Sequence, residues 1–305
     1  MNPPAGSGTA AGRLVLVDGY GQIYRNYYAI RGLSAPGGQP TNALYGMARF
    51  MLSLDAALPH DFGALVLDKG RPAHRLALLP EYKATRPPMP DDLRSQLEPI
   101  KAWAQASGWP VLQSEGFEAD DLIAAVVAAC ADREVAIVTH DKDLGQLVRP
   151  GVCLMQSGPK GALDRLGRDE VTAKFGVPPE QIRDYLALVG DTVDNIAGVP
   201  GVGAKTAAAL LQRFGSAEGI LEHLAEIDRP AVREALTAAA EILRRNVRLI
   251  ALSETLPPGW NGIEGLRRRK PDWQALIGMA REFGFKSLLT ELERRLQDER
   301  NPSLF

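Results

Sequence analysis

Short apolar runs alternate with longer stretches of helical period through the first half of the chain. The stretches 42–58, 93–107 and 120–131 repeat apolar residues with the period of a helix. Between them lie runs rich in Val, Leu and Ile that are typical of fully buried strands: 14–17, 64–67, 111–112, 135–138 and 152–155. This alternation predicts an α/β fold with a central, mainly parallel sheet.

The second half of the chain shows no such strands beyond about residue 158. Helical periods punctuated by Gly and Pro follow instead, at 169–175, 179–189, 205–214, 231–249 and 273–297. We place a boundary near residues 160–180, with an α/β core over 13–175 and an all-helical region over 176–300. The segment 1–12 is rich in Pro, Gly, Ala and Ser and lacks the basic start and apolar stretch of a signal peptide, so we predict a flexible leader.

Composition narrows the function classes. The chain carries 35 Lys+Arg against 37 Asp+Glu, which excludes a uniformly basic protein that coats nucleic acid. Cys130 and Cys153 both lie in apolar runs, as buried thiols do in a reducing compartment, and form no zinc motif. The longest apolar stretch, 122–131, is far shorter than the ~20 residues that cross a bilayer. We therefore expect a soluble, cytoplasmic protein with no membrane partner.

Acidic residues follow three of the predicted strands. Asp18 ends the first and Asp68 the second, and the fourth runs through His140 into Asp141 and Asp143. The carboxyl ends of parallel strands meet at one edge of a sheet, where functional groups gather. A single Asp after a strand is ordinary turn chemistry. Three at one edge repel each other unless a cation shares the site, which favours a metal site.

Two further acidic groups adjoin helices. Glu118-Ala119-Asp120-Asp121 precedes the helix at 122, where acids also serve as caps, and Asp191 and Asp194 follow the helix ending at 189, where a solvated helix end is the alternative. Many carboxylates without a His or Cys partner indicate Mg²⁺ or Mn²⁺, two or more ions. Paired divalent ions are the usual device for phosphodiester hydrolysis, because they activate water and stabilise the leaving oxygen. The candidate ligands are Asp18, Asp68, Glu118, Asp120, Asp121, Asp141, Asp143, Asp191 and Asp194.

A glycine-rich segment opens the helix near 205. It differs from a P-loop because Ala204 separates the last Gly from Lys205, and no strand precedes it. Its pattern matches a helix-hairpin-helix, in which backbone N–H groups at a helix start bind a DNA phosphate. A plain link between helices is the alternative. The candidate DNA-binding residues are Gly201, Val202, Gly203, Ala204, Lys205 and Thr206.

A basic segment, 81–90, follows the strand that ends at Asp68. Lys83 and Arg86 are three residues apart and would project together from a short helix, with Tyr82 available to stack on a base. A solvated basic helix has equal weight on spacing alone. The insertion directly after a metal-ligand strand lets these cations overhang the metals, which favours a phosphate-binding role.

Taken in order, these motifs resemble the bacterial 5′ nuclease (flap endonuclease) family. The resemblance is greatest to the N-terminal 5′-3′ exonuclease domain of DNA polymerase I and covers about residues 13–255. It rests on Val17-Asp18-Gly19, Asp68, Tyr82-Lys83, Arg86-Pro87-Pro88-Met89-Pro90, Glu118-Ala119-Asp120-Asp121, Asp141-Lys142-Asp143, Asp191, Asp194-Asn195 and Gly198-Val199-Pro200-Gly201-Val202-Gly203. The family implies a PIN-like core with a helical arch, here around 71–95, and a helix-hairpin-helix (H3TH) region that binds duplex DNA with K⁺.

The resemblance also implies roles for residues. Asp18, Asp68, Glu118, Asp120 and Asp121 would hold the first metal site, with Asp141, Asp143, Asp191 and Asp194 around the second. Lys83, Arg86, Asp120 and Asp121 would be catalytic, Tyr82 would stack near the displaced base, and Arg25 would contact DNA. The K⁺ ligands would be carbonyls of Leu188, Val189, Ala197, Val199 and Val202.

Departures from the family's pattern leave every carboxylate in place. Tyr20-Gly21 follows the first Asp-Gly, His140 precedes Asp-Lys-Asp and could perturb the second metal site, and Ala197 replaces a common Pro. The chain ends at Phe305, which implies a stand-alone nuclease, expected to be a monomer.

The predicted function is a structure-specific 5′ nuclease of replication and repair, acting on DNA with 5′ flaps, nicks or 5′ ends. The alternatives are a non-catalytic DNA-binding protein and a PIN-like ribonuclease. The ending Leu304-Phe305 resembles a sliding-clamp-binding peptide, although a polar chain end without a partner is the commoner explanation for so short a match.

Overall fold

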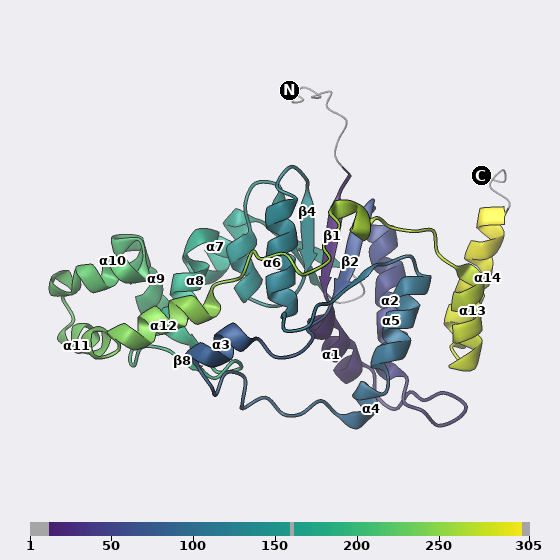
Figure 1. Cartoon of the computed structure of the whole chain (residues 1–305), viewed down its shortest axis with the longest axis horizontal. Helices are drawn as coiled ribbons and strands as arrows, with labels where there is room; N and C mark the ends of the chain where they lie inside the picture. The colour runs from purple at the N-terminus through teal and green to yellow at the C-terminus, as the bar shows by residue number, and fades with distance from the viewer. Residues whose placement is uncertain (1–11, 159–161, 301–305) are drawn as a thin grey trace, which may run out of the picture.

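The computed structural model describes residues 12–158 and 162–300. At its centre is a six-stranded sheet in the order β3-β2-β1-β4-β5-β6 (Figure 1). The strands are β1 (Leu14–Asp18), β2 (Phe62–Val66), β3 (Val111–Leu112), β4 (Val135–Val138), β5 (Val152–Ser157) and β6 (Leu163–Leu166). The first five are parallel, as predicted, and β6 pairs antiparallel with β5. The strand order reverses between β1 and β4, which makes their carboxyl ends the expected place for a site.

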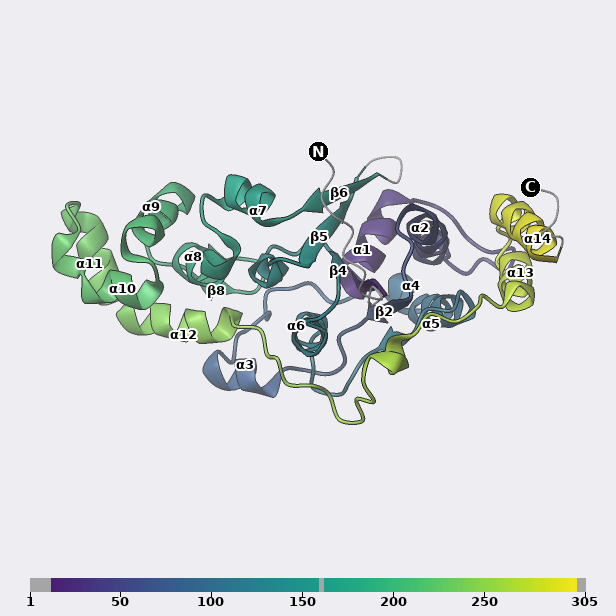
Figure 2. The ribbon, with the colours of Figure 1, turned by 90° about the horizontal axis from the view of Figure 1, so that it is seen from above.

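Helices cover both faces of the sheet (Figure 2). Successive side chains of a strand point to opposite faces, so Leu14 and Leu16 enter one buried cluster and Val15 and Val17 the other. The first cluster includes α6 (Ala119–Ala129), whose Leu122, Ile123 and Val126 are fully buried. The second face is covered by α1 (Gly19–Ala29), α2 (Asn42–Ala57), α5 (Leu97–Ala106), α13 (Trp273–Glu282) and α14 (Lys286–Arg300).

The region after β6 is helical, as predicted. Its helices are α7 (Arg168–Phe175), α8 (Ile182–Val189), α9 (Ala204–Phe214), α10 (Ala217–Glu222), α11 (Pro230–Ala238) and α12 (Ala240–Ile250). Their apolar faces join the same buried cluster as α6, so core and helical region share one interior. Two predicted helices are each two helices: 231–249 breaks at Ala239, and 273–297 breaks at Gly284, whose φ is 71°. The short strands β7 (Gly190–Asp191) and β8 (Ile196–Ala197) pair antiparallel between α8 and α9.

The predicted arch is helical only in part. It contains α3 (Ala73–Leu78) and α4 (Asp91–Arg94), and residues 79–90 between them form turns and extended chain along the lower edge of Figure 1. The prediction that Lys83 and Arg86 lie on a short helix is wrong. Lys83 has a φ of 57°, which a helix does not allow, and its N–H donates to the carbonyl of Asp194, 3.0 Å away. The segment thus combines local turns with a long-range hydrogen bond to the chain at Asp194.

Two predictions fall on the ends of the chain, and a third concerns membrane spans. The leader falls, except for residue 12, outside the described residues, and so does the clamp-binding peptide at 301–305. Within the described ranges, every helix is too short or too polar to cross a bilayer.

Candidate active site

A pocket of about 790 Å³ lies at the carboxyl ends of β1, β2 and β4. Side chains from strand ends, α1, the segment 79–90 and the start of α6 line it, so residues far apart in sequence converge there. The lining includes Asp18, Tyr20, Tyr24, Tyr28, Asp68, Lys83, Arg86, Pro87, Met89, Asp120, His140 and Asp141. The prediction that the strand-end carboxylates meet at one edge of the sheet is thus confirmed.

The strand-end carboxylates are held by hydrogen bonds. Asp18 accepts from the Thr139 hydroxyl at 2.8 Å and from the Gly21 N–H at 3.3 Å, and Asp68 accepts from the Ala119 N–H at 2.6 Å. Burial, with a further contribution from Asp141, raises the pKa of Asp18 to about 6. Burial also raises the pKa of Asp68. Such shifts arise where burial and like charges disfavour the ionised carboxylate.

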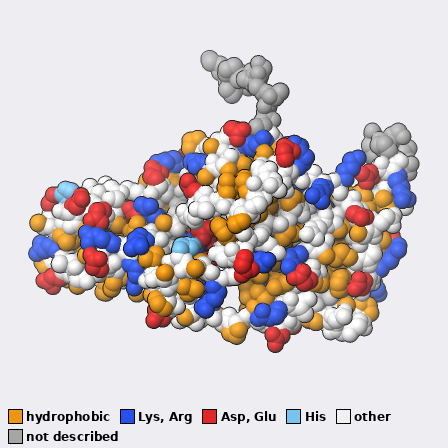
Figure 3. Space-filling view, in the orientation of Figure 1, with side chains coloured by type: hydrophobic (Ala, Val, Ile, Leu, Met, Phe, Trp, Pro, Cys, Tyr) orange, Lys and Arg blue, Asp and Glu red, His pale blue; other side chains and the backbone are white. Residues whose placement is uncertain are grey.

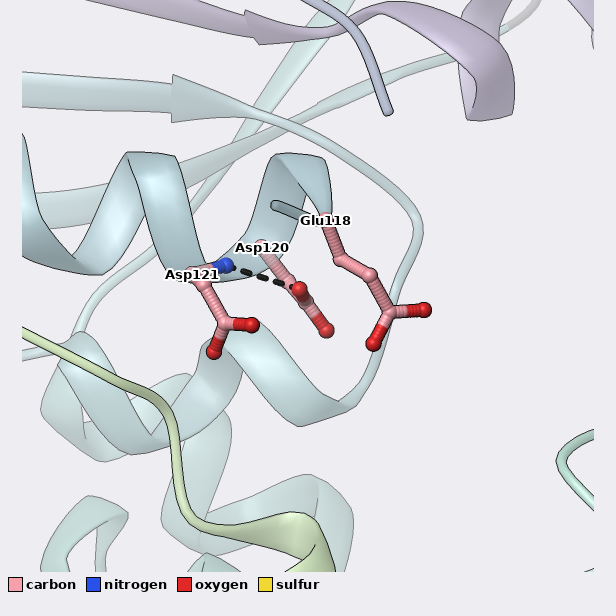
Figure 4. Close-up of side chains that lie close together, drawn as sticks. All are labelled: Glu118, Asp120 and Asp121. Carbon is pink, nitrogen blue, oxygen red and sulfur yellow. Dashed lines mark hydrogen bonds between the residues drawn. The ribbon is translucent and has the colours of Figure 1, made fainter. Parts of the chain in front are cut away.

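The first turn of α6 carries one compact acidic group. Glu118, Asp120 and Asp121 each offer an oxygen within 4.8 Å of the others, and their side chains point to the same side of the helix start (Figure 4). The Asp121 N–H donates to Asp120 at 2.7 Å, which fixes the Asp120 side chain. Burial raises the pKa of Asp120 well above its usual value.

A second acidic group joins Asp143, Asp191 and Asp194, again with oxygens within 4.8 Å of one another. Asp143 Oδ1 is buried without a hydrogen-bond partner. Burial and the neighbouring Asp141 raise the pKa of Asp143 to about 8. Lys142 lies 3.0 Å from Asp191 and offsets part of the negative charge of this group.

These donor sets fit divalent ions. Every ligand atom in both groups is a carboxylate oxygen, and the orphaned oxygen of Asp143 is one that a cation would satisfy. Asp18, Asp68 and Asp141 line the pocket but belong to neither compact group. How the strand-end carboxylates divide between the two groups therefore stays a prediction.

The arch cations contact both acidic groups. Lys83 pairs with Glu118 and lies 3.9 Å from Asp194, and Arg86 pairs with Asp194. Burial lowers the pKa of Lys83, but Glu118 and Asp194 outweigh it and raise the pKa above its usual value. Lys83 is therefore a permanent cation in the pocket.

Tyr82, predicted to stack on a base, points inward in this structure, and the stacking role stays a prediction. Its side chain is buried, and its hydroxyl donates to Asp194 at 3.1 Å. The ring instead lies beside two cations, with Lys83 Nζ 5.0 Å and Arg75 Cζ 6.0 Å from its centroid.

Sequence reasoning missed Arg75, which is 1% exposed. It comes from α3 and forms ion pairs with Glu118 and, at 2.6 Å, with Asp121. Its partners are more than 40 residues away in sequence, so no local pattern indicates them. In the sequence, an arginine directly before the apolar run 76–79 is typical of a surface residue.

The predicted duplex-binding turn has an open helix start. Gly203 caps α9 without a side-chain bond, Gly201 has a φ of 75°, and no atom lies within 4 Å of where a Cβ would sit at either Gly. Lys205 is exposed beside them. Free N–H groups next to an exposed cation suit an anion.

The predicted K⁺ carbonyls are already used in part. The Leu188 carbonyl accepts from the Val199 N–H, and the Val199 carbonyl accepts from the Val202 N–H. The Ala197 carbonyl accepts from the side chain of the buried Asn246. A carbonyl can accept twice, and the K⁺ site, with Val189 and Val202, stays a prediction.

Two further residues named from the sequence, Arg25 and His140, both contact Ser157. Arg25 is exposed on α1 and donates to the Ser157 carbonyl at 2.9 Å. His140 lies 3.1 Å from the Ser157 hydroxyl. Burial and the nearby Arg25 lower the pKa of His140, so it is neutral at neutral pH and adds no charge to the second acidic group.

Positive and negative side chains are interspersed over the face seen in Figure 3, including the helical region on its left. At the pocket, by contrast, carboxylates and arch cations lie together.

Comparison with known proteins identifies the family. The family profile described as "5'-3' exonuclease, N-terminal resolvase-like domain" matches residues 13–176, and "5'-3' exonuclease, C-terminal SAM fold" matches residues 177–274. The chain belongs to the 5′-3′ exonuclease family. The family assignment made from the ordered motifs is confirmed, and so is the PIN-like fold followed by a helical region.

Individual relatives agree with this family. The chain is 42% identical to DNA polymerase I of Pseudomonas aeruginosa over 294 residues, 93% of this chain and 32% of that protein. It is 35% identical to the 5'-3' exonuclease of Aquifex aeolicus, over 96% of this chain and 99% of that protein. It thus spans about a third of the polymerase relative. Among solved structures, the 5'-exonuclease of phage T5 with zinc bound is 25% identical with a TM-score of 0.66, covering 78% and 89% of the two chains.

Proposed function

We propose that this protein is a divalent-metal-dependent, structure-specific 5′ nuclease that cleaves DNA at single-strand/duplex junctions, as 5′-3′ exonuclease and 5′-flap endonuclease. The observation that carries the proposal is that Lys83 and Arg86, which line the pocket together with carboxylates, pair with members of both compact acidic groups. The carboxylates that line the pocket are those of Asp18, Asp68, Asp120 and Asp141. Phosphodiester hydrolysis of this kind needs carboxylates that bind divalent ions and a side-chain cation that binds the phosphate.

Two Mg²⁺ or Mn²⁺ ions would be held by Glu118 and Asp120 with the strand-end carboxylates, and by Asp143, Asp191 and Asp194. When bound, they supply a Lewis acid and an activated water at neutral pH. Lys83 and Arg86 would turn from the carboxylates to the scissile phosphate and orient it. The products would carry a 5′-phosphate and a 3′-hydroxyl.

The open start of α9 would bind a duplex phosphate and place the junction over the pocket. Contacts from Gly201, Gly203 and Lys205 carry no sequence information, so recognition would depend on DNA shape. K⁺ at the adjacent turn, action in replication and repair, and clamp binding through Leu304-Phe305 are further parts of the proposal.

Cleavage of a 5′-flap duplex by Asp120→Asn protein tests the function. We expect loss of cleavage in Mg²⁺ or Mn²⁺, with flap-duplex affinity unchanged in Ca²⁺. Asp228→Asn, at a side chain that is 95% exposed, is the matched control and should cleave normally. Undiminished turnover of the Asp120 variant would refute the proposal, and cleavage of RNA but not DNA would favour the ribonuclease alternative.

A further inference from the structure

Arg75 lies at a junction of three elements. It belongs to α3, at the base of the arch, and reaches between the first turn of α6 and the end of α12. Its side chain is as buried as the core leucines, at 1% exposed. A charge at that depth is retained only where partners satisfy it completely.

All the donors of the Arg75 guanidinium are used. Nε donates to the Leu249 carbonyl at 3.0 Å and Nη2 to the Ala251 carbonyl at 3.3 Å, both at the end of α12. Nη1 donates to Glu118 and to Asp121 Oδ2, and Nη2 also donates to Asp121 Oδ1 at 2.8 Å. A guanidinium has five N–H groups, and these contacts account for each of them.

The electrostatics of the junction explain why an arginine suits it. Carboxyl-terminal carbonyls of α12 have no partner within their own helix and carry partial negative charge. Glu118 and Asp121 add full negative charges beside them. Burial lowers the pKa of Arg75, but Asp120, Asp121 and Glu118 outweigh it, so the cation persists. Lysine has the charge but only three donors and no planar fork.

Asp121 differs from Asp120, the member of the acidic group that lines the pocket. Arg75 engages both oxygens of Asp121, and Oδ1 also accepts from the Ser253 N–H at 2.8 Å. Its side chain is 1% exposed, against 17% for Asp120, and only Asp120 lines the pocket. Its hydrogen-bonding capacity is thus directed at the junction and away from the pocket.

We propose that Arg75 is a positioning residue that holds Glu118 in place for metal binding, and that Asp121 anchors Arg75 and is not a metal ligand. This rests on the proposed nuclease function and adds to it a link from the acidic group to the α12 end of the helical region. It also revises the prediction from sequence that Asp121 holds the metal.

Mn²⁺ binding to the DNA-free protein can be measured by electron paramagnetic resonance. In the Arg75→Lys variant it distinguishes the contribution of the guanidinium geometry from that of the positive charge. Arg75→Lys keeps the charge and loses the fork. We expect its Mn²⁺ dissociation constant to rise at least ~10-fold and kcat on a 5′-flap to fall at least ~10-fold, with KM within ~2-fold, as when a partner of a metal ligand is lost. The control is Arg294→Lys, at a side chain that is 63% exposed. Mn²⁺ affinity equal to or tighter than wild type, or a change in KM alone, would overturn the positioning role.

The number of Mn²⁺ ions bound tests Asp121 directly, even if Arg75→Lys fails to fold. Asp121→Asn should keep the wild-type number at reduced affinity, whereas Asp120→Asn should lose one ion. In the Arg75→Lys background, Asp121→Asn should add less than ~2-fold, because residues that act as a unit are not additive. Loss of an ion by Asp121→Asn would make it a ligand and overturn the proposal. If Asp120→Asn still cleaves DNA, the proposed function itself fails; normal behaviour of the Arg75 variant alone rejects only this inference.

Discussion

Replacing Asp143 by Asn tests whether the second acidic group destabilises the metal-free fold. Burial, Asp141 and Asp194 raise the pKa of Asp143 from 3.8 to about 8. The folded state then binds the proton of Asp143 more tightly than the unfolded chain does. The protonated carboxyl therefore contributes its full stability below pH 3.8, and this contribution is lost as the pH rises through about 8. Each tenfold difference in proton affinity is worth ~1.4 kcal/mol, so full ionisation of Asp143 costs the fold several kcal/mol. Asp141, Asp191 and Asp194 share this repulsion, so removing one charge should recover ~2 kcal/mol.

The assay is thermal unfolding across pH, with chelator and with Mg²⁺. In chelator at about pH 9, we expect the Tm of Asp143→Asn to exceed that of the wild type by ~4 °C, and the difference to vanish near pH 5. With Mg²⁺ the order should reverse, since only the wild type gains full stabilisation from the ion.

The matched control is Asp228→Asn, the same chemical change at a side chain that is 95% exposed, which should shift Tm by less than ~1 °C. Equal Tm values for wild type and Asp143→Asn in chelator at about pH 9 would refute the reasoning, because they would mean that the carboxylate is not strained by its neighbours.

Three other substitutions test separate parts of the molecule. Lys83→Ala should lower single-turnover cleavage ~100-fold with little change in flap affinity; a loss of affinity alone would make Lys83 a simple phosphate contact. Lys205→Ala should weaken duplex binding and reduce the slope of log K against log salt by ~1, and an unchanged slope would remove α9 from the DNA interface. Gly198→Ala places a Cβ 2.3 Å from the Val189 carbonyl and should cost ~1–3 kcal/mol of unfolding free energy in urea titration; wild-type stability would mean that the turn relaxes freely.

The strands were predictable because burial on both faces leaves a continuous apolar run. β1, β2, β4 and β5 are buried almost throughout, and each was recognised from its Val, Leu and Ile content. The edge strand β6 was missed because Leu163–Leu166 has apolar residues only at its two ends. The helix α1 was missed because its face mixes tyrosines with polar residues.

The carboxylates of the site were predictable because parallel strands deliver their ends to one edge whatever the intervening sequence. The contacts among them were not. Tyr82 looks like a solvent-facing aromatic in sequence, but it is buried because Asp194, 112 residues later, accepts its hydroxyl. The role of Arg75 is likewise set by Glu118 and Asp121 and by α12, 174 residues away. Such pairings arise only when the helical region closes on the core.

The return of α13 and α14 to the face of the sheet opposite α6 sets the smallest fragment that can fold. A fragment ending at residue 274, where the second family profile ends, would lack Leu276, Ile277, Phe285, Leu288 and Leu292, all buried against the side of the core formed by α2 and α5. The apolar surface left behind would invite self-association. An autonomous nuclease module cut from a longer polypeptide should therefore extend through Arg300.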